Sequence, residues 1–118
     1  MSNVSLSTAL SGMSAANERL RASANNVANA ATPGYRRVDV DFHSALSAAL
    51  GSSDARSAVE NTAFTTQQDS VGVTQADGNS IDVDNESAKL AANALESEAA
   101  VTVAKTRIAI LKSAMGVA

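Results

Sequence analysis

The spacing of residues near the two ends of the chain constrains its fold more than any other feature. Between Leu6 and Ala31, steps of four and three residues alternate without interruption. The positions in this N-terminal seam are Leu6, Leu10, Met13, Asn17, Leu20, Ala24, Val27 and Ala31. Such a heptad pattern predicts an α-helix that packs along one face on a partner helix. We expect this helix over residues 3–32, because Pro33 lacks the backbone donor needed to continue it.

The C-terminal part of the chain repeats the pattern. Its seam consists of Leu90, Ala94, Ser97, Val101, Ala104, Ile108, Leu111 and Met115. Acidic residues gather in the first half of this segment and basic residues in the second, an order that complements a helix dipole. We expect a second helix over residues 85–116. The predicted fold is a single, mainly α domain over residues 1–118, with its terminal helices packed as a coiled-coil pair.

Both seams contain small or polar residues where a stable coiled coil carries large apolar ones. Of the 118 residues, 25 are alanine, whereas Leu, Ile, Val and Phe together number 24. Small side chains let helices approach closely but bury little apolar area per turn. The pair could therefore fold alone as a hairpin, or neighbouring subunits could complete it. Leu95, Val103 and Ile110 lie off the C-terminal seam and favour the second alternative, because a second apolar stripe requires a second partner.

The asparagines of the first helix each have two interpretations. Asn17 on the seam either fixes helix register or is a tolerated, partly hydrated residue. Asn25, Asn26 and Asn29 lie off the seam. They either form hydrogen bonds with neighbouring backbone and side chains at the helix end, or cap the last turn before Pro33.

The middle segment, residues 33–84, has a different character. Val38, Val40 and Phe42 alternate with aspartates, which predicts a short strand or an extended arm. Ser44 to Leu50 is compatible with one or two helical turns, and residues 77–79 give a turn signal. For the rest of this segment we expect weak β structure or a loop that orders on contact, so the middle of the domain is extended or weakly β. The only bulky anchors in residues 54–76 are Phe64, Val71 and Val73.

Composition argues against several classes of function. The chain has no cysteine, one histidine (His43) and a formal net charge of −3, so we expect no metal site, no cofactor and no nucleic acid partner. The acidic run from Asp77 to Glu86 lacks the spacing of a calcium loop, and a turn followed by a helix cap explains it better. We find no catalytic constellation, no small-molecule substrate site, no membrane-spanning stretch and no secretory signal peptide.

Two motifs resemble the axial proteins of the bacterial flagellum, a family of rod, hook and hook-associated proteins. The first is the run Ala24-Asn25-Asn26-Val27-Ala28-Asn29-Ala30-Ala31-Thr32-Pro33-Gly34-Tyr35-Arg36. The second is Asp77-Gly78-Asn79-Ser80-Ile81-Asp82-Val83-Asp84-Asn85-Glu86, which is similar to the C-terminal half of proximal rod proteins. The opening Ala9-Leu10-Ser11-Gly12-Met13 is closer to a sister rod protein, so a divergent rod paralogue is the alternative within the family.

The resemblance implies a structural subunit of the proximal rod that polymerises into a helical tube and transmits motor torque across the periplasm. It implies export through the flagellar type III apparatus without signal cleavage. The implied partners are further copies of the chain, other rod proteins, the export apparatus, and ring or junction proteins of the basal body. A cytosolic coiled-coil adaptor or an export chaperone is the competing interpretation.

Tyr35 follows the helix breaker and either anchors the turn against the helical layer or packs as an ordinary loop residue. We predict that assembly contacts involve the two seams and the motif at the end of the first helix. The residues are Leu10, Met13, Asn17, Leu20, Val27, Asn25, Asn26, Asn29, Pro33, Gly34, Tyr35, Leu90, Val101, Ile108, Leu111 and Met115.

Overall fold

The computed structural model describes residues 4–64, 66–68 and 73–117, and within them it contains four helices and two short strands. In chain order these are α1 (Val4–Ala28), β1 (Val38–Val40), α2 (Phe42–Leu50), α3 (Ala55–Glu60), β2 (Thr66–Gln68) and α4 (Val83–Ala114). The predicted fold class is confirmed: the chain is mainly helical, and its terminal helices pack against each other. Asn3, the first residue of the predicted N-terminal helix, lies outside the described residues.

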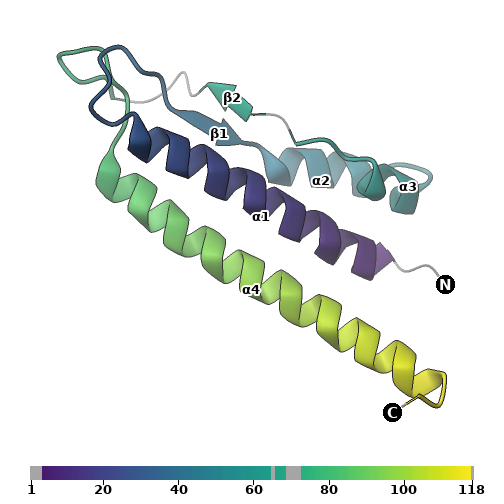
Figure 1. The fold of residues 1–118 in the computed structure, drawn as a ribbon. Helices are drawn as coiled ribbons and strands as arrows, with labels where there is room; N and C mark the ends of the chain where they lie inside the picture. The colour runs from purple at the N-terminus through teal and green to yellow at the C-terminus, as the bar shows by residue number, and fades with distance from the viewer. Residues whose placement is uncertain (1–3, 65, 69–72, 118) are drawn as a thin grey trace.

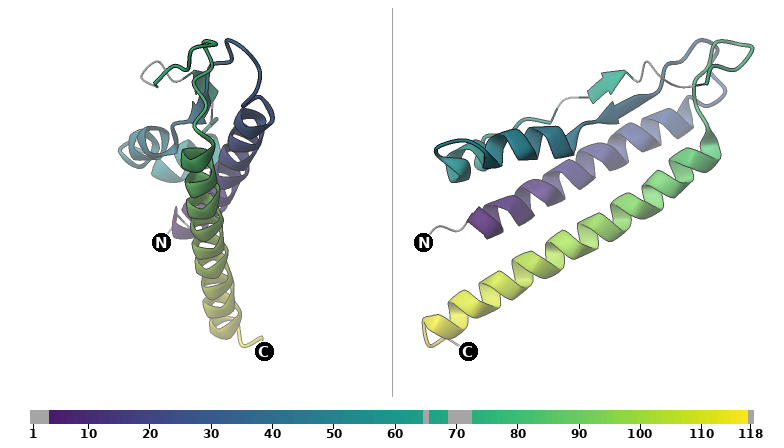
Figure 2. Two further views of the ribbon diagram at one scale, coloured as in Figure 1. Left: turned by 90° about the vertical axis from the view of Figure 1, so that its left-hand side faces the viewer. Right: turned by 180° about the vertical axis from the view of Figure 1, so that it is seen from behind.

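Helix α1 is the middle layer of the molecule (Figure 1). On one side it contacts α4, which runs antiparallel to it, and on the other it contacts β1 and α3. The view from behind shows the same order of layers (Figure 2). We call β1, α2, α3 and β2 together the arm. The molecule measures 62 × 32 × 14 Å along its principal axes. No described element covers the outer side of the arm or of α4.

Side-chain hydrogen bonds determine where the two long helices meet the loops. Helix α1 ends at Ala28 rather than at residue 32. Just after Ala28, Asn29 Nδ2 donates to the carbonyl of Asn25 (2.9 Å), and a tight turn follows. Helix α4 begins at Val83 rather than at residue 85. Its N-cap is Asp82, whose carboxylate accepts hydrogen bonds from two backbone amides of the first turn. The acidic run is therefore a turn followed by a helix cap, as expected from the sequence.

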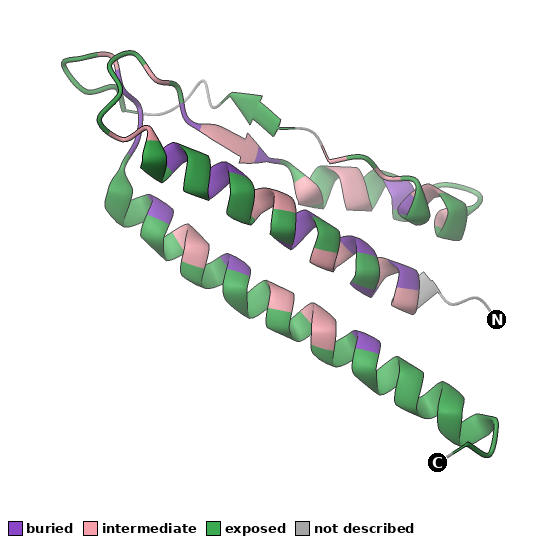
Figure 3. Cartoon of the chain, in the orientation of Figure 1, coloured by how far each residue is buried: buried purple, intermediate pink, exposed green. Residues whose placement is uncertain are grey.

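The buried core consists mainly of small side chains. Figure 3 shows where the buried residues lie along the elements. Six of the nine buried apolar residues in the described part of the chain are alanines: Ala9, Ala15, Ala16, Ala22, Ala49 and Ala104. The three larger ones are Val40, Val59 and Ile81. Larger apolar side chains such as Leu10 and Ile110 are instead more than half exposed. The chain thus encloses little apolar area per residue, which limits its stability as a monomer.

The face of α1 that packs on α4 is displaced by one residue from the predicted seam. Its members include Gly12, Ala16 and Arg19, each one position before a seam residue. A Cβ atom on Gly12 would lie 3.7 Å from the Cβ of Ala100, so the backbones approach closely here. One residue corresponds to about 100° of helix rotation, so the seam lies at the edge of this face: Leu10 and Val27 are exposed, and Leu20 borders the groove between the two helices.

The arm contains the short extended segment expected from the alternating valines. Strand β1 pairs antiparallel with β2, with Val38 opposite Gln68. The predicted helical turns extend from Phe42 to Leu50 as α2, and α3 is a further helix that the sequence pattern did not predict. Asp41 and Asp54 are the N-caps of these helices, and their side chains accept hydrogen bonds from the backbone amides of the first turn.

Aromatic contacts hold the arm to itself and to α1. The Phe64 ring packs at 5.4 Å from that of Phe42, so Phe64 is an anchor as expected. The guanidinium of Arg19 lies over the Phe42 ring at 5.6 Å. Val73 is 92% exposed and is therefore not an anchor among the described residues, so that expectation was wrong. Val71 lies outside the described residues.

Candidate assembly site

The two sequence motifs that carried the family resemblance meet at one end of the molecule. The loop of residues 29–37 follows α1, and the loop of residues 75–82 precedes α4. Two backbone hydrogen bonds join them: the Gly34 amide donates to the Asp77 carbonyl, and the Ser80 amide donates to the Tyr35 carbonyl, both at 3.0 Å. We call the paired loops the clasp. It fixes the end of α1 to the beginning of α4.

Asn79 is the central side chain of the clasp. It is fully buried, and its amide nitrogen donates to the carbonyls of Asn29 (2.9 Å) and Thr32 (2.7 Å). Its amide oxygen accepts from the backbone of Ile81 at 2.7 Å. One side chain therefore adds a second hydrogen bond to two carbonyls after α1, each of which already accepts from a backbone amide, and satisfies the amide of Ile81 just before α4 begins. Removing it would leave the buried Ile81 amide without this partner and would loosen the link between the two loops.

Two glycines allow the loops of the clasp to touch. Gly34 and Gly78 have φ angles of +73° and +84°, values that favour glycine strongly. A Cβ atom on Gly78 would lie 3.3 Å from the Cα of Gly34, closer than ordinary van der Waals contact. The backbones thus meet with no side chain between them.

Asn26 attaches the arm to α1 beside the clasp. Its side chain donates to the Val38 carbonyl at 2.8 Å and accepts from the Val38 amide at 3.0 Å, so it pairs with β1 as another strand would. Asn26 is completely buried, whereas Asn25 is exposed. The neighbouring asparagines therefore differ in environment: Asn26 bonds within the chain, and Asn25 remains on the surface.

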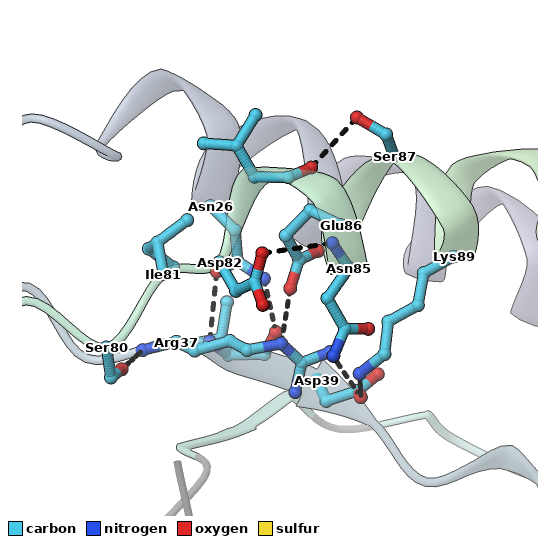
Figure 4. Close-up of polar contacts among 12 residues, drawn as sticks. Asn26, Arg37, Asp39, Ser80, Ile81, Asp82, Asn85, Glu86, Ser87 and Lys89 are labelled. Carbon is cyan, nitrogen blue, oxygen red and sulfur yellow. Dashed lines mark hydrogen bonds and ion pairs between the residues drawn. The ribbon is translucent and has the colours of Figure 1, made fainter. Parts of the chain in front are cut away.

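A buried ion pair connects the arm to α4 (Figure 4). The Arg37 guanidinium donates through Nε to the fully buried carboxylate of Glu86 and through Nη2 to Asp39, the latter at 2.7 Å. Lys89 of α4 lies 3.3 Å from the same Asp39 oxygen. Three elements thus contribute to one polar cluster: the loop after α1, strand β1 and the first turns of α4.

The cluster perturbs the ionisation of its members. Burial alone would raise the pKa of Asp39, but hydrogen bonds from Arg37 and the Val40 amide, with the positive charges of Arg37 and Lys89, lower it below its usual value. Burial would likewise lower the pKa of Arg37, yet its two carboxylate partners raise it. Both groups remain charged at neutral pH. Loss of one partner from a buried ion pair typically costs about 3–5 kcal/mol, so the cluster holds the arm in place.

An open groove runs between α1 and α4. It encloses about 480 Å³. Its lining residues are Ala16, Asn17, Leu20, Asn93, Ala94, Ser97, Glu98, Val101, Thr102 and Lys105. Small residues form the floor and Leu20 and Val101 are its larger apolar side chains. A groove of this shape can receive the larger side chains of another helix.

The structure brings some of the predicted assembly residues together and leaves others apart. Asn17, Leu20 and Val101 line the groove, whereas Ile108, Leu111 and Met115 lie on α4 beyond it. Leu10 and Val27 are exposed on α1, and Met13 and Leu90 are half-buried. Pro33 and Gly34 are exposed in the clasp, where Tyr35 is half-buried and Asn29 bonds locally. Whether these residues form contacts between subunits remains a prediction.

Three buried polar side chains that position the loops and α4 were not predicted from the sequence: Asn79, Arg37 and Glu86. Asn79 and Glu86 belong to the second motif, and Arg37 directly follows the first, but none was singled out as a positioning residue. Asn79 follows the Asp-Gly pair of a turn, and Glu86 lies one turn into a helix, where acids are common for electrostatic reasons alone. The only usable signal was that both motifs contain glycine and asparagine, which are common in tight turns.

The described residues offer no site for a metal and no membrane span. They contain no group of three or more histidine, aspartate or glutamate side chains placed to hold a metal ion. None of the helices in this part of the chain is both long enough and apolar enough to cross a membrane.

Comparison with known proteins gives two matches. A model of the family described as flagella basal body rod protein matches residues 6–36, which cover most of α1 and the first half of the clasp. The flagellar basal body rod protein FlgB of Aeromonas hydrophila is 29% identical over 113 residues, covering 87% of this chain and 86% of that protein. These matches confirm the resemblance seen in the sequence. They support a FlgB-type rod protein with a structural role in the flagellar basal body, in a family of structural proteins rather than enzymes.

Proposed function

We propose that this chain, as a FlgB-type rod protein, is a subunit of the proximal rod that polymerises into a helical tube and transmits motor torque across the periplasm. The observation that carries the proposal is the position of the α1 seam. This seam lies within the matched residues 6–36, yet Leu10, Leu20 and Val27 on it are 54%, 49% and 38% exposed. A helix that presents a heptad seam to solvent is suited to a partner outside its own chain.

Assembly supplies the contacts that the single chain lacks. Ordering the backbone costs about 1–2 kcal/mol per residue, and a core made largely of alanine offsets little of that cost. Contacts between subunits along both long helices would add apolar burial to each copy. Torque is then distributed over many shallow helix–helix contacts, with no single residue carrying the load.

Export through the type III apparatus fits the same chain. A subunit that crosses a narrow channel must be unfolded or nearly so, and a chain without disulfides and with few bulky residues has little stability to lose. The proposed partners are other copies of the chain, other rod proteins, the export apparatus, and ring or junction proteins of the basal body.

Cell fractionation tests the proposal. In the bacterium that carries this gene, the protein is expected in isolated basal bodies, and its arrival there is expected to require a working type III apparatus. Recovery only in the cytosol would contradict the proposal and favour a coiled-coil adaptor or export chaperone.

A substitution test examines the surface involved. Val101→Asp and Ile108→Asp are expected to abolish rod assembly and swimming while expression continues, because each places a charge on a predicted contact surface. Ala99→Asp is the matched control, since Ala99 is exposed on the same helix outside both the seam and the groove. Normal swimming of both seam variants would refute the assignment of this surface.

A further inference from the structure

The last turns of α4 have no partner among the described residues. From Lys105 to Val117 every residue is exposed, and Figure 3 shows this part of α4 continuing past the beginning of α1. Ile108, Leu111 and Met115 are 46%, 41% and 69% exposed. We call residues 106–115 the α4 tail.

The apolar stripe of the tail continues the surface by which α4 packs on α1. Leu90, Ser97 and Ala104 are half-buried or buried on that surface, and Ile108, Leu111 and Met115 follow at the same heptad spacing. In the N-terminal part of α4, this surface is covered by α1. The tail therefore presents the same kind of helix-binding surface with larger side chains and nothing described to cover it.

The groove between α1 and α4 has the complementary shape. Its floor contains Ala16, Ala94 and Ser97, which leave space that larger side chains can fill. Helix–helix packing places the bulky residues of one helix into the spaces between residues of another. The tail has such residues, whereas the groove has the spaces.

Charge also favours this pairing. The tail carries Arg107 and Lys112 and no acidic residue. Glu98 lines the groove, whose end next to the tail also contains Lys105, and Asp84 lies exposed in the first turn of the same helix. A basic tail is therefore attracted toward Glu98 and the acidic beginning of α4, away from Lys105.

We propose that the α4 tail of one copy lies in the groove between α1 and α4 of a second copy. This inference rests on the proposed function and adds to it the pair of surfaces that meet. Because the tail and the groove are different surfaces of one chain, the contact is heterologous. Each copy can bind one neighbour through its tail and another through its groove, so the contact produces an open polymer.

Thiol crosslinking tests the proposal directly, because the natural chain has no cysteine. The test variant is Ala94→Cys combined with Leu111→Cys, one substitution in the groove and one on the tail. The two sites are 17 residues apart on one helix, about 26 Å, so a short crosslinker cannot join them within a chain. In isolated basal bodies we expect a ladder of crosslinked dimers, trimers and higher multimers.

Two matched controls change one surface at a time. Ala92→Cys with Leu111→Cys moves the groove site to an exposed alanine outside the groove. Ala94→Cys with Ile110→Cys moves the tail site about 100° around the helix, to a residue that is 54% exposed. We expect at least a fivefold weaker ladder from each control.

The outcomes separate this inference from the proposed function. Basal bodies that contain the protein but give no ladder, or equal ladders from test and control variants, would overturn the tail-and-groove contact and leave the rod assignment intact. Crosslinking of Leu111→Cys to a different rod protein would also overturn it. Absence of the natural protein from basal bodies would refute both. If the test variant fails to assemble, Leu20→Cys with Met115→Cys supplies a second pair on the same surfaces, judged by the same criterion.

Discussion

Gly34 and Asn79 show how a few small residues determine the connection between two long helices. The sequence predicted a helix end at residue 32 and a turn at residues 77–79; the turn is present, whereas the helix ends four residues earlier, at Ala28. It did not indicate that these turns bind each other, because about 45 residues separate them and their hydrogen bonds have no periodic signature. The same holds for Arg37 and Glu86, whose pairing depends on the arm folding back along α1.

The two glycines of the clasp are expected to respond differently to alanine. Gly34→Ala introduces only the cost of a positive φ angle, about 1 kcal/mol. Gly78→Ala should cost more, because its new Cβ atom also lies 3.3 Å from the Gly34 backbone. Urea unfolding of the isolated chain, in a stabilising osmolyte, measures both.

Gly51→Ala is the control for that comparison, since Gly51 has a φ angle of −80° and meets only ordinary contacts. It should leave the unfolding midpoint unchanged or raise it slightly. Equal losses at all three glycines would contradict the described geometry of the clasp.

Acid is expected to weaken the polar cluster around Arg37. The pKa of Asp39 is lower in the folded chain than in the unfolded one, so the unfolded state binds more protons between the two values. The contribution of Asp39 is therefore complete above its unfolded pKa of about 3.9 and is lost as pH falls through the lowered value.

Asp39→Asn removes this contribution. The variant should be less stable than the natural chain at pH 7, and its stability should decline less steeply between pH 5 and pH 3. Urea midpoints across that range provide the measurement. Parallel pH curves for the two proteins would show that Asp39 is not coupled to the cluster.

At the scale of elements, the heptad period was read correctly but the rotation of α1 was not. A sequence analysis places the largest apolar residues of an amphipathic helix inward. Here the inward positions contain glycine, alanine and serine, because α1 is packed between α4 and the arm. Close packing on two sides leaves Leu10, Leu20 and Val27 outward. Periodicity alone cannot distinguish a seam for an internal partner from one for an external partner.

Two alanine-to-leucine substitutions in α1 separate these surfaces. Ala15→Leu should destabilise the isolated chain by about 1–3 kcal/mol, because Ala15 is only 1% exposed and extra methyl groups must displace neighbours. Ala24→Leu, on the exposed seam, should change stability by about 0.5 kcal/mol or less. Urea unfolding tests both, and similar losses would show that the seam of α1 is already buried in the monomer.

At the scale of the whole molecule, the shortage of large buried side chains should make the isolated chain only marginally stable. We expect a broad thermal transition at micromolar concentration and a helix content, measured by circular dichroism, that rises as the protein concentrates. A sharp, concentration-independent transition with full helix content would show that the chain does not need neighbours. Composition predicted the shortage of large buried side chains, and the alternating valines predicted the strand of the arm. Helix α3 could not be predicted, because its residues lack a regular pattern.

The contact between Gly34 and Gly78 also restricts how the family can diverge. Most tight contacts can be relieved by a second substitution, since a larger side chain on one side is compensated by a smaller one opposite. Here the atom facing position 78 is backbone, which no substitution at position 34 can make smaller. No substitution at position 34 can therefore compensate for a side chain at position 78. Relatives that retain this clasp are expected to retain glycine at position 78 even after the surrounding helices have changed most of their residues.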